Sequence, residues 1–185
     1  MSMLLATILL QATAPTAPDL TPMVALYQEA CLDSSPSDGQ LDALMAKKGA
    51  TPLSPDEVKV TLRDDPGRGW RLIDGGRRYL VFLELPPFHA CSVRGGVGSD
   101  AADLAPYRAV LQTFKSKNPG FSPQPPADLD QGAIHIHGES EYRQLPGGTG
   151  EQLIVIAQQI TDPERRAKGE TGTDLRFVHQ IKQGN

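Results

Sequence analysis

The sequence predicts an α+β fold: an antiparallel sheet of about six strands in two three-stranded meanders, with N-terminal helices and one long helix between the meanders. Apolar residues recur at helical spacing up to about residue 63 and again over 104–117. They alternate with a period of two, or fill whole segments, over 70–94 and from 133 onwards. Short turns join consecutive strands, which makes neighbours antiparallel and leaves the helices for one face of the sheet.

Three short helices are expected first, over residues 22–32, 37–49 and 54–63. The second begins at Ser37, which with Gln40 three residues on has the form of a capping box. The third begins at Ser54, and Asp56 and Glu57 place acidic side chains in its first turn, where the helix dipole favours them. The first helix has an apolar stripe made by Val24, Tyr27 and Cys31.

The first meander is expected over residues 70–94. Its opening strand starts at Trp70, and the two glycines at 75 and 76 form a hairpin turn. Residues 78–85 are apolar on both faces, which is typical of a central strand. The third strand, over 88–94, contains Cys91.

The long helix over 104–117 carries a regular apolar stripe that includes Tyr107 and Leu111. Four prolines between 119 and 126 then predict an extended crossing segment or a linker. The second meander follows, with strands near 133–143, 152–160 and 175–181. Residues 162–174 are charged and lack apolar periodicity, so they are expected to form a mobile loop.

The N-terminus reads as an export signal. Residues 3–10 form a short apolar run, and Ala12-Thr13-Ala14 has the form of a cleavage site. We therefore expect residues 1–20 to be a signal peptide and flexible lead, and residues 21–185 to be one α+β domain in the bacterial periplasm or secreted, with no transmembrane segment in the mature chain. The alternative is that the apolar run is a buried first strand or helix.

The formal net charge of −4 argues against nucleic acid as the main partner. The chain lacks the common nucleotide-binding, serine-hydrolase and zinc-protease motifs. No catalytic residue is assigned.

Cys31 and Cys91 are the only two cysteines. In an exported chain an even count favours one disulfide, here between a helix and a strand. Two alternatives remain: two buried thiols, or a Cys91 nucleophile with His89 as its base, since residues two apart on a strand share a face.

One segment could hold a metal. Over residues 133–143, His135, His137 and Glu141 share the parity that places them on one strand face, and two imidazoles with a carboxylate can bind a divalent cation. The run resembles the first metal-ligand motif of the cupin family, and the resemblance would make these three residues ligands. It departs from that motif at Leu129, where the family has glycine. The alternative is a half-buried strand whose polar side chains form its outer face.

The chain as a whole resembles small exported bacterial proteins of unknown function. The resemblance rests on the signal-like start, on Cys31 in the first helix, on the Gly69-Trp70 strand opening and on the segment from Phe88 to Arg94. It implies export and a single domain, and it transfers no activity.

Two functions follow from these observations. The first is a non-enzymatic binding or interaction module of the cell envelope, whose partner is an envelope protein or a small ligand. The second is a metal-dependent enzyme or metal-binding protein that uses His135, His137 and Glu141.

Overall fold

The computed structural model describes residues 18–35, 37–98, 102–170 and 172–182. The predicted signal segment at residues 1–17 lies outside them. All strands of the described residues belong to one antiparallel sheet in the order β1-β2-β3-β4-β9-β8-β7-β5, and β6 also pairs with β7. Its strands are β1 (Thr51–Pro52), β2 (Gly67–Asp74), β3 (Arg77–Glu84), β4 (Ala90–Gly96), β5 (Ser122–Pro123), β6 (Ala127–Gln131), β7 (Ile134–Gln144), β8 (Gly150–Ile160) and β9 (Thr173–Lys182).

The two predicted meanders are confirmed as β2-β3-β4 and β7-β8-β9. They meet at the centre of the sheet, where β4 pairs with β9 along its full length. The prediction of about six strands is too low, because the sheet has nine within the described residues. The extra strands are β1, β5 and β6, which lie at the sheet edges. They are short or wholly exposed, so they carry no apolar alternation that a sequence pattern could reveal.

The helices are α1 (Thr21–Tyr27), η1 (Gln28–Asp33), α2 (Asp38–Lys47), α3 (Pro55–Leu62), α4 (Ala105–Lys117), η2 (Pro146–Gly148) and α5 (Pro163–Ala167). The first predicted helix is therefore α1 continued by a π-helical segment, η1. The segment 162–174, expected to be a loop without regular structure, contains the short helix α5. It begins because the Asp162 side chain accepts a hydrogen bond from the Arg165 amide.

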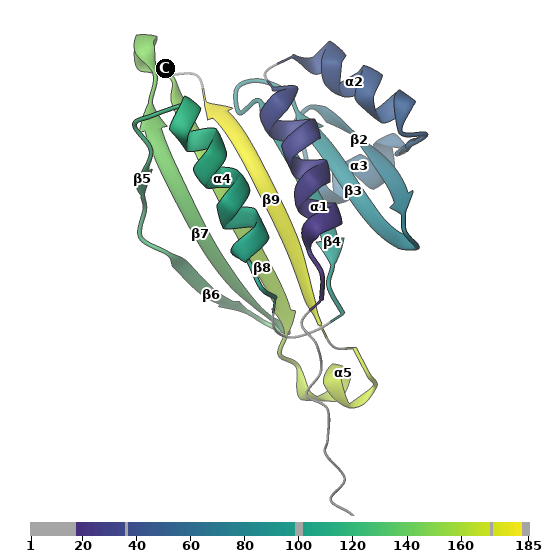
Figure 1. The fold of residues 1–185 in the computed structure, drawn as a ribbon. Coiled ribbons are helices and arrows are strands. Elements are labelled where there is room, and N and C mark those ends of the chain that lie inside the picture. The colour runs from purple at the N-terminus through teal and green to yellow at the C-terminus, as the bar shows by residue number, and fades with distance from the viewer. Residues whose placement is uncertain (1–17, 36, 99–101, 171, 183–185) are drawn as a thin grey trace, which may run out of the picture.

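Helices α1 and α4 lie side by side across one face of the sheet, with α4 over the β7–β8 side (Figure 1). The main core lies beneath them. At their junction the ring of Tyr107 from α4 stacks on Phe177 of β9 with centroids 4.4 Å apart, and Tyr27 of α1 lies 5.6 Å from the same phenylalanine.

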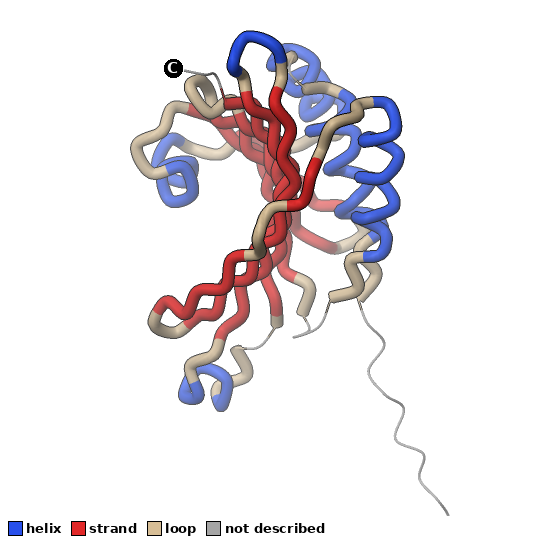
Figure 2. The backbone as a smooth tube through the Cα atoms, turned by 90° about the vertical axis from the view of Figure 1, so that its left-hand side faces the viewer, coloured by secondary structure: helices blue, strands red, loops and turns tan. Residues whose placement is uncertain are grey.

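Helix α3 lies on the opposite face, which corrects the expectation that all helices cover one face. Figure 2 shows the sheet edge-on, with α3 on one side and α1, α2 and α4 on the other. Alternation along β3 explains this placement, because Val81 and Leu83 point into the main core while Phe82 packs against Val58 and Leu62 of α3.

Each half of the chain ends in a three-stranded meander that follows at least one helix and one short edge strand, and the first half adds η1, α2 and α3. The last strands of the two meanders, β4 and β9, pair antiparallel, so the two meanders form one continuous sheet. The first half fills the space beside its helix with η1 and α2. In the second half α4 stands alone over its strands (Figure 1).

Candidate functional site

The inner face of β7, which looks toward α4, is polar. His135, His137, Glu139, Glu141 and Arg143 share the parity of this face, and three of them meet α4 or the cleft beside it. The apolar alternates, such as Ile136, therefore look toward the uncovered face. The expectation of a polar outer face for this strand is wrong. The polar side chains of β7 face the helix layer, and its aliphatic side chains face the opposite side of the sheet.

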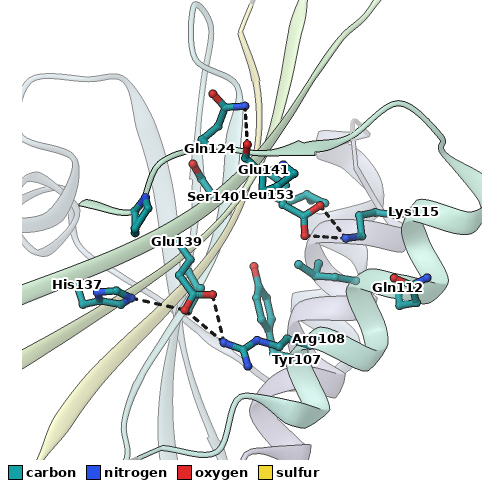
Figure 3. A pocket seen from close by; sticks show the side chains of 14 residues that line it. Tyr107, Arg108, Gln112, Lys115, Gln124, His137, Glu139, Ser140, Glu141 and Leu153 are labelled. Atoms are coloured by element: carbon teal, nitrogen blue, oxygen red, sulfur yellow. Dashed lines mark hydrogen bonds and ion pairs between the residues drawn. The ribbon is translucent and has the colours of Figure 1, made fainter. Parts of the chain in front are cut away.

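A cleft of about 480 Å³ lies between α4 and strands β7 and β8 (Figure 3). Its floor is apolar and consists of Leu111 from α4 with Leu153 and Val155 from β8, which are all buried. Two residues of the proline-rich segment, Pro123 and Pro126, line its rim. The volume is in the range of small-molecule sites, which are mostly apolar with a few placed polar groups.

Two ion pairs join α4 to β7 across the cleft (Figure 3). The ammonium of Lys115 lies 2.7 Å from both carboxylate oxygens of Glu141, and both side chains are about three-quarters buried. The second pair is looser. The Arg108 guanidinium lies 3.3 Å from both oxygens of Glu139, and the Arg108 side chain is 64% exposed.

The Tyr107 hydroxyl points into the cleft between these two ion pairs (Figure 3). Tyr107 is 3% exposed, and its hydroxyl has no hydrogen-bond partner among the described residues. Tyr27 donates its own hydroxyl hydrogen to the Val178 carbonyl at 3.1 Å. The two hydroxyls are near enough for each to affect the pKa of the other, but their contact does not meet the geometry of a hydrogen bond. Burial, then the charges of Glu141 and Glu139, raise the pKa of Tyr107 well above its usual range, so the phenol keeps its proton.

A buried charged cluster lies beyond the end of the cleft. The carboxylate of Glu151 on β8 pairs with Arg143 of β7 and with Nε2 of His179 on β9, the latter at 2.6 Å. The other ring nitrogen, Nδ1, lies 2.7 Å from the carbonyl oxygen of Cys31. Both nitrogens of His179 therefore face oxygen atoms that can accept a hydrogen bond.

The predicted metal ligands are split between two places. His135 and His137 lie beside the β6 carboxylate of Asp128, whose Oδ1 is 2.8 Å from His137 Nδ1 and 3.5 Å from His135 Nε2. Glu141 instead binds Lys115. Within the described part of the chain, no three His, Cys, Asp or Glu side chains are grouped to hold a metal ion. The metal site remains a prediction from sequence.

The cysteine prediction is confirmed: Cys31 of η1 and Cys91 of β4 form a disulfide, and the described residues contain no free cysteine. The two alternatives, buried thiols and a Cys91 nucleophile, are thereby replaced. His89 has a different partner, because its Nε2 lies 2.7 Å from Asp38 Oδ1.

The sequence pattern did not identify three residues of the cleft as functional. Tyr107 reads there as part of an apolar stripe, and Arg108 and Lys115 carry no motif. One signal was present: Arg108 and Lys115 are two helical turns apart, while Glu139 and Glu141 are two apart on a strand. The match between these pairs becomes visible only when α4 is known to pack on β7.

Among the described residues, no helix combines the length and the apolar character needed to cross a membrane. Comparison with family models, with curated proteins and with solved structures found no match.

Proposed function

We propose that this protein is an exported, disulfide-bonded binding module of the bacterial cell envelope, and that it holds a small, largely apolar ligand in the cleft between α4 and β7–β8. The observation that carries the proposal is the cleft itself. A volume of about 480 Å³ over the buried floor of Leu111, Leu153 and Val155 is suited to a small ligand, and the unpaired hydroxyl of Tyr107 adds a polar contact.

Two features support the exported location. The Cys31–Cys91 disulfide belongs to an oxidising compartment, and the apolar run at residues 3–10 has the length of a signal core. The test is expression of the full chain in a bacterial host, with mass spectrometry of the periplasmic and cytoplasmic fractions. Export requires a shortened, oxidised chain in the periplasm. A full-length, reduced chain confined to the cytoplasm would refute it.

Ligand binding is tested with N-phenyl-1-naphthylamine, a neutral dye that fluoresces in apolar surroundings. Gln112 lines the cleft at the exposed side of α4, so Gln112→Trp should fill the opening without disturbing the core. We expect wild type to bind the dye and this variant to lose at least tenfold in affinity.

The matched control is Thr113→Trp, which places the same ring on the next residue of α4, exposed and away from the cleft lining. It should bind the dye like wild type. Equal binding by all three proteins would place the dye elsewhere, for example on the uncovered sheet face, and would overturn the cleft as the binding site.

A further inference from the structure

We infer that the ligand of the cleft is a neutral, mostly apolar molecule with one hydrogen-bond acceptor, such as a ketone, ester or amide carbonyl, which the Tyr107 hydroxyl binds. This inference rests on the proposed function and adds the chemical class of the ligand. Three properties of the cleft lead to it: the paired state of its charges, the unpaired state of its one buried hydroxyl, and its apolar floor.

The charged side chains that line the cleft already have partners of opposite charge within the protein. Lys115 neutralises Glu141, and Arg108 neutralises Glu139. His137 is 2.8 Å from Asp128. An ionic head group would therefore have to break one of these pairs or place an uncompensated charge in a partly desolvated cleft, and both cost free energy. A neutral ligand avoids this cost.

The Tyr107 hydroxyl is the polar group that the fold leaves for a ligand. Within the described residues nothing accepts its hydrogen, although the side chain is 97% removed from solvent. Buried polar groups in folded proteins almost always have a partner, so an exception calls for an explanation. Because the phenol stays protonated, it offers a donor, and its complement is an acceptor.

The hydroxyl oxygen is itself covered by surrounding side chains. A ligand therefore reaches it only when these side chains part. The looser of the two ion pairs, Arg108 with Glu139, is at the more exposed end and has contacts of 3.3 Å against 2.7 Å for Lys115 with Glu141. Opening of the Arg108–Glu139 pair is the route that disturbs the fewest buried groups.

The experiment compares four compounds with similar phenylbutyl skeletons by displacement of N-phenyl-1-naphthylamine. Butylbenzene has no strong acceptor, butyrophenone adds a carbonyl, 4-phenylbutyrate is an anion and 4-phenylbutylamine is a cation at neutral pH. Although butylbenzene is the more hydrophobic, we expect butyrophenone to bind about fivefold more tightly, the effect of one net hydrogen bond. Both ionic compounds should bind at least tenfold more weakly than butyrophenone.

Tyr107→Phe removes the donor and keeps the ring, so the preference for butyrophenone over butylbenzene should disappear. Tyr27→Phe is the control, because that hydroxyl already donates to Val178, and it should keep the preference. The infrared carbonyl stretch of bound butyrophenone gives a readout on wild type alone: it should lie at lower frequency than in an alkane solvent, where nothing donates to the carbonyl. A stretch at the alkane value, or a preference that survives Tyr107→Phe, would overturn the inference.

The outcomes separate the two proposals. If Gln112→Trp weakens the binding of all four compounds, but wild type does not prefer butyrophenone over butylbenzene, the cleft binds ligands and the assigned ligand class is wrong. If 4-phenylbutyrate or 4-phenylbutylamine binds most tightly, the ligand is ionic and this inference falls alone. If Gln112→Trp leaves the affinity for the dye and for all four compounds unchanged, both the proposed function and the assigned ligand class are wrong.

Discussion

At the scale of single residues, Tyr107 and Tyr27 form an informative pair. Both are buried tyrosines that contact Phe177, and they differ in what their hydroxyls do. The hydroxyl of Tyr27 donates to a strand carbonyl, whereas that of Tyr107 has no partner in the described structure. A buried polar group without a partner costs about 1–3 kcal/mol, and one with a partner contributes about 1 kcal/mol.

We therefore expect Tyr107→Phe to raise the free energy of unfolding of the ligand-free protein by about 1 kcal/mol. Tyr27→Phe should lower it by about 1 kcal/mol, because the Val178 carbonyl loses its donor. Urea denaturation of both variants measures the difference. If Tyr107→Phe were as destabilising as Tyr27→Phe, the Tyr107 hydroxyl would have a partner in solution, and its availability to a ligand would be in doubt.

The carboxyl group of Glu151 makes the stability of the fold depend on pH. Burial alone raises the pKa of this carboxyl, but the hydrogen bonds and charges of His179 and Arg143 outweigh burial and hold the pKa below its ordinary value of 4.5. Since the folded-state value is the lower one, folding favours the ionised form. The resulting stability is present above the ordinary value and is lost as the pH falls through the folded-state pKa.

Unfolding free energy measured from pH 6 down to pH 3 should thus fall below about pH 4.5, and Glu151→Gln should flatten part of this slope. At pH 7 the same variant should be less stable than wild type, because Arg143 and His179 lose their buried carboxylate. A control is Glu164→Gln on the exposed side of α5, which should retain the wild-type slope. An unchanged acid slope in Glu151→Gln would contradict this assignment.

At the scale of elements, α3 shows how a short helix is fixed from its own sequence. The Ser54 side chain accepts a hydrogen bond from the Glu57 amide, and the Glu57 carboxylate accepts one from the Ser54 amide. This capping box starts the helix, and Val58 and Leu62 then attach it to Phe82 on the face that no other long helix covers.

Ser54→Ala should lower the free energy of unfolding by about 1 kcal/mol, since it removes the acceptor for a first-turn amide. Ser37→Ala, at the start of α2, should cost less, because the Ser37 contact is a single bond of 3.4 Å without the reciprocal carboxylate. Chemical denaturation compares the two. A larger loss for Ser37→Ala would show that α2 depends more on its cap than α3 does.

At the scale of the whole molecule, the disulfide joins the two layers. It links η1 in the helical layer to β4 at the centre of the sheet and closes a loop of 60 residues. The carbonyl of Cys31 also accepts from His179, so the buried charged cluster and the disulfide meet at one residue.

Restricting a chain over 60 residues stabilises the fold by about 4 kcal/mol in the chain-entropy description. The variant with both Cys31 and Cys91 changed to Ala should therefore unfold at markedly lower urea concentration than the oxidised protein. Dithiothreitol should bring wild type toward the variant and leave the variant unchanged. Equal midpoints for oxidised wild type and variant would show that the disulfide does not hold the two layers together.

The sequence by itself determined the features that depend on neighbours along the chain. Alternation over 70–94 and 133–181 predicted both meanders, and the even cysteine count predicted the disulfide. A capping-box pattern predicted the start of α2, and acidic residues in the first turn predicted the start of α3. Each is local chemistry or simple pairing. The sequence did not predict the edge strands β1, β5 and β6, because an exposed strand of two to five residues needs no apolar pattern.

The tertiary structure alone decided which face of each strand is covered. The parity of β7 puts His137, Glu139 and Glu141 on one face, but parity does not say on which side a helix will pack. That choice depends on where α4 crosses the sheet, a contact between segments far apart in sequence. It turned the expected polar outer face of β7 into the wall of a cleft and left the Tyr107 hydroxyl there without a partner from the described chain.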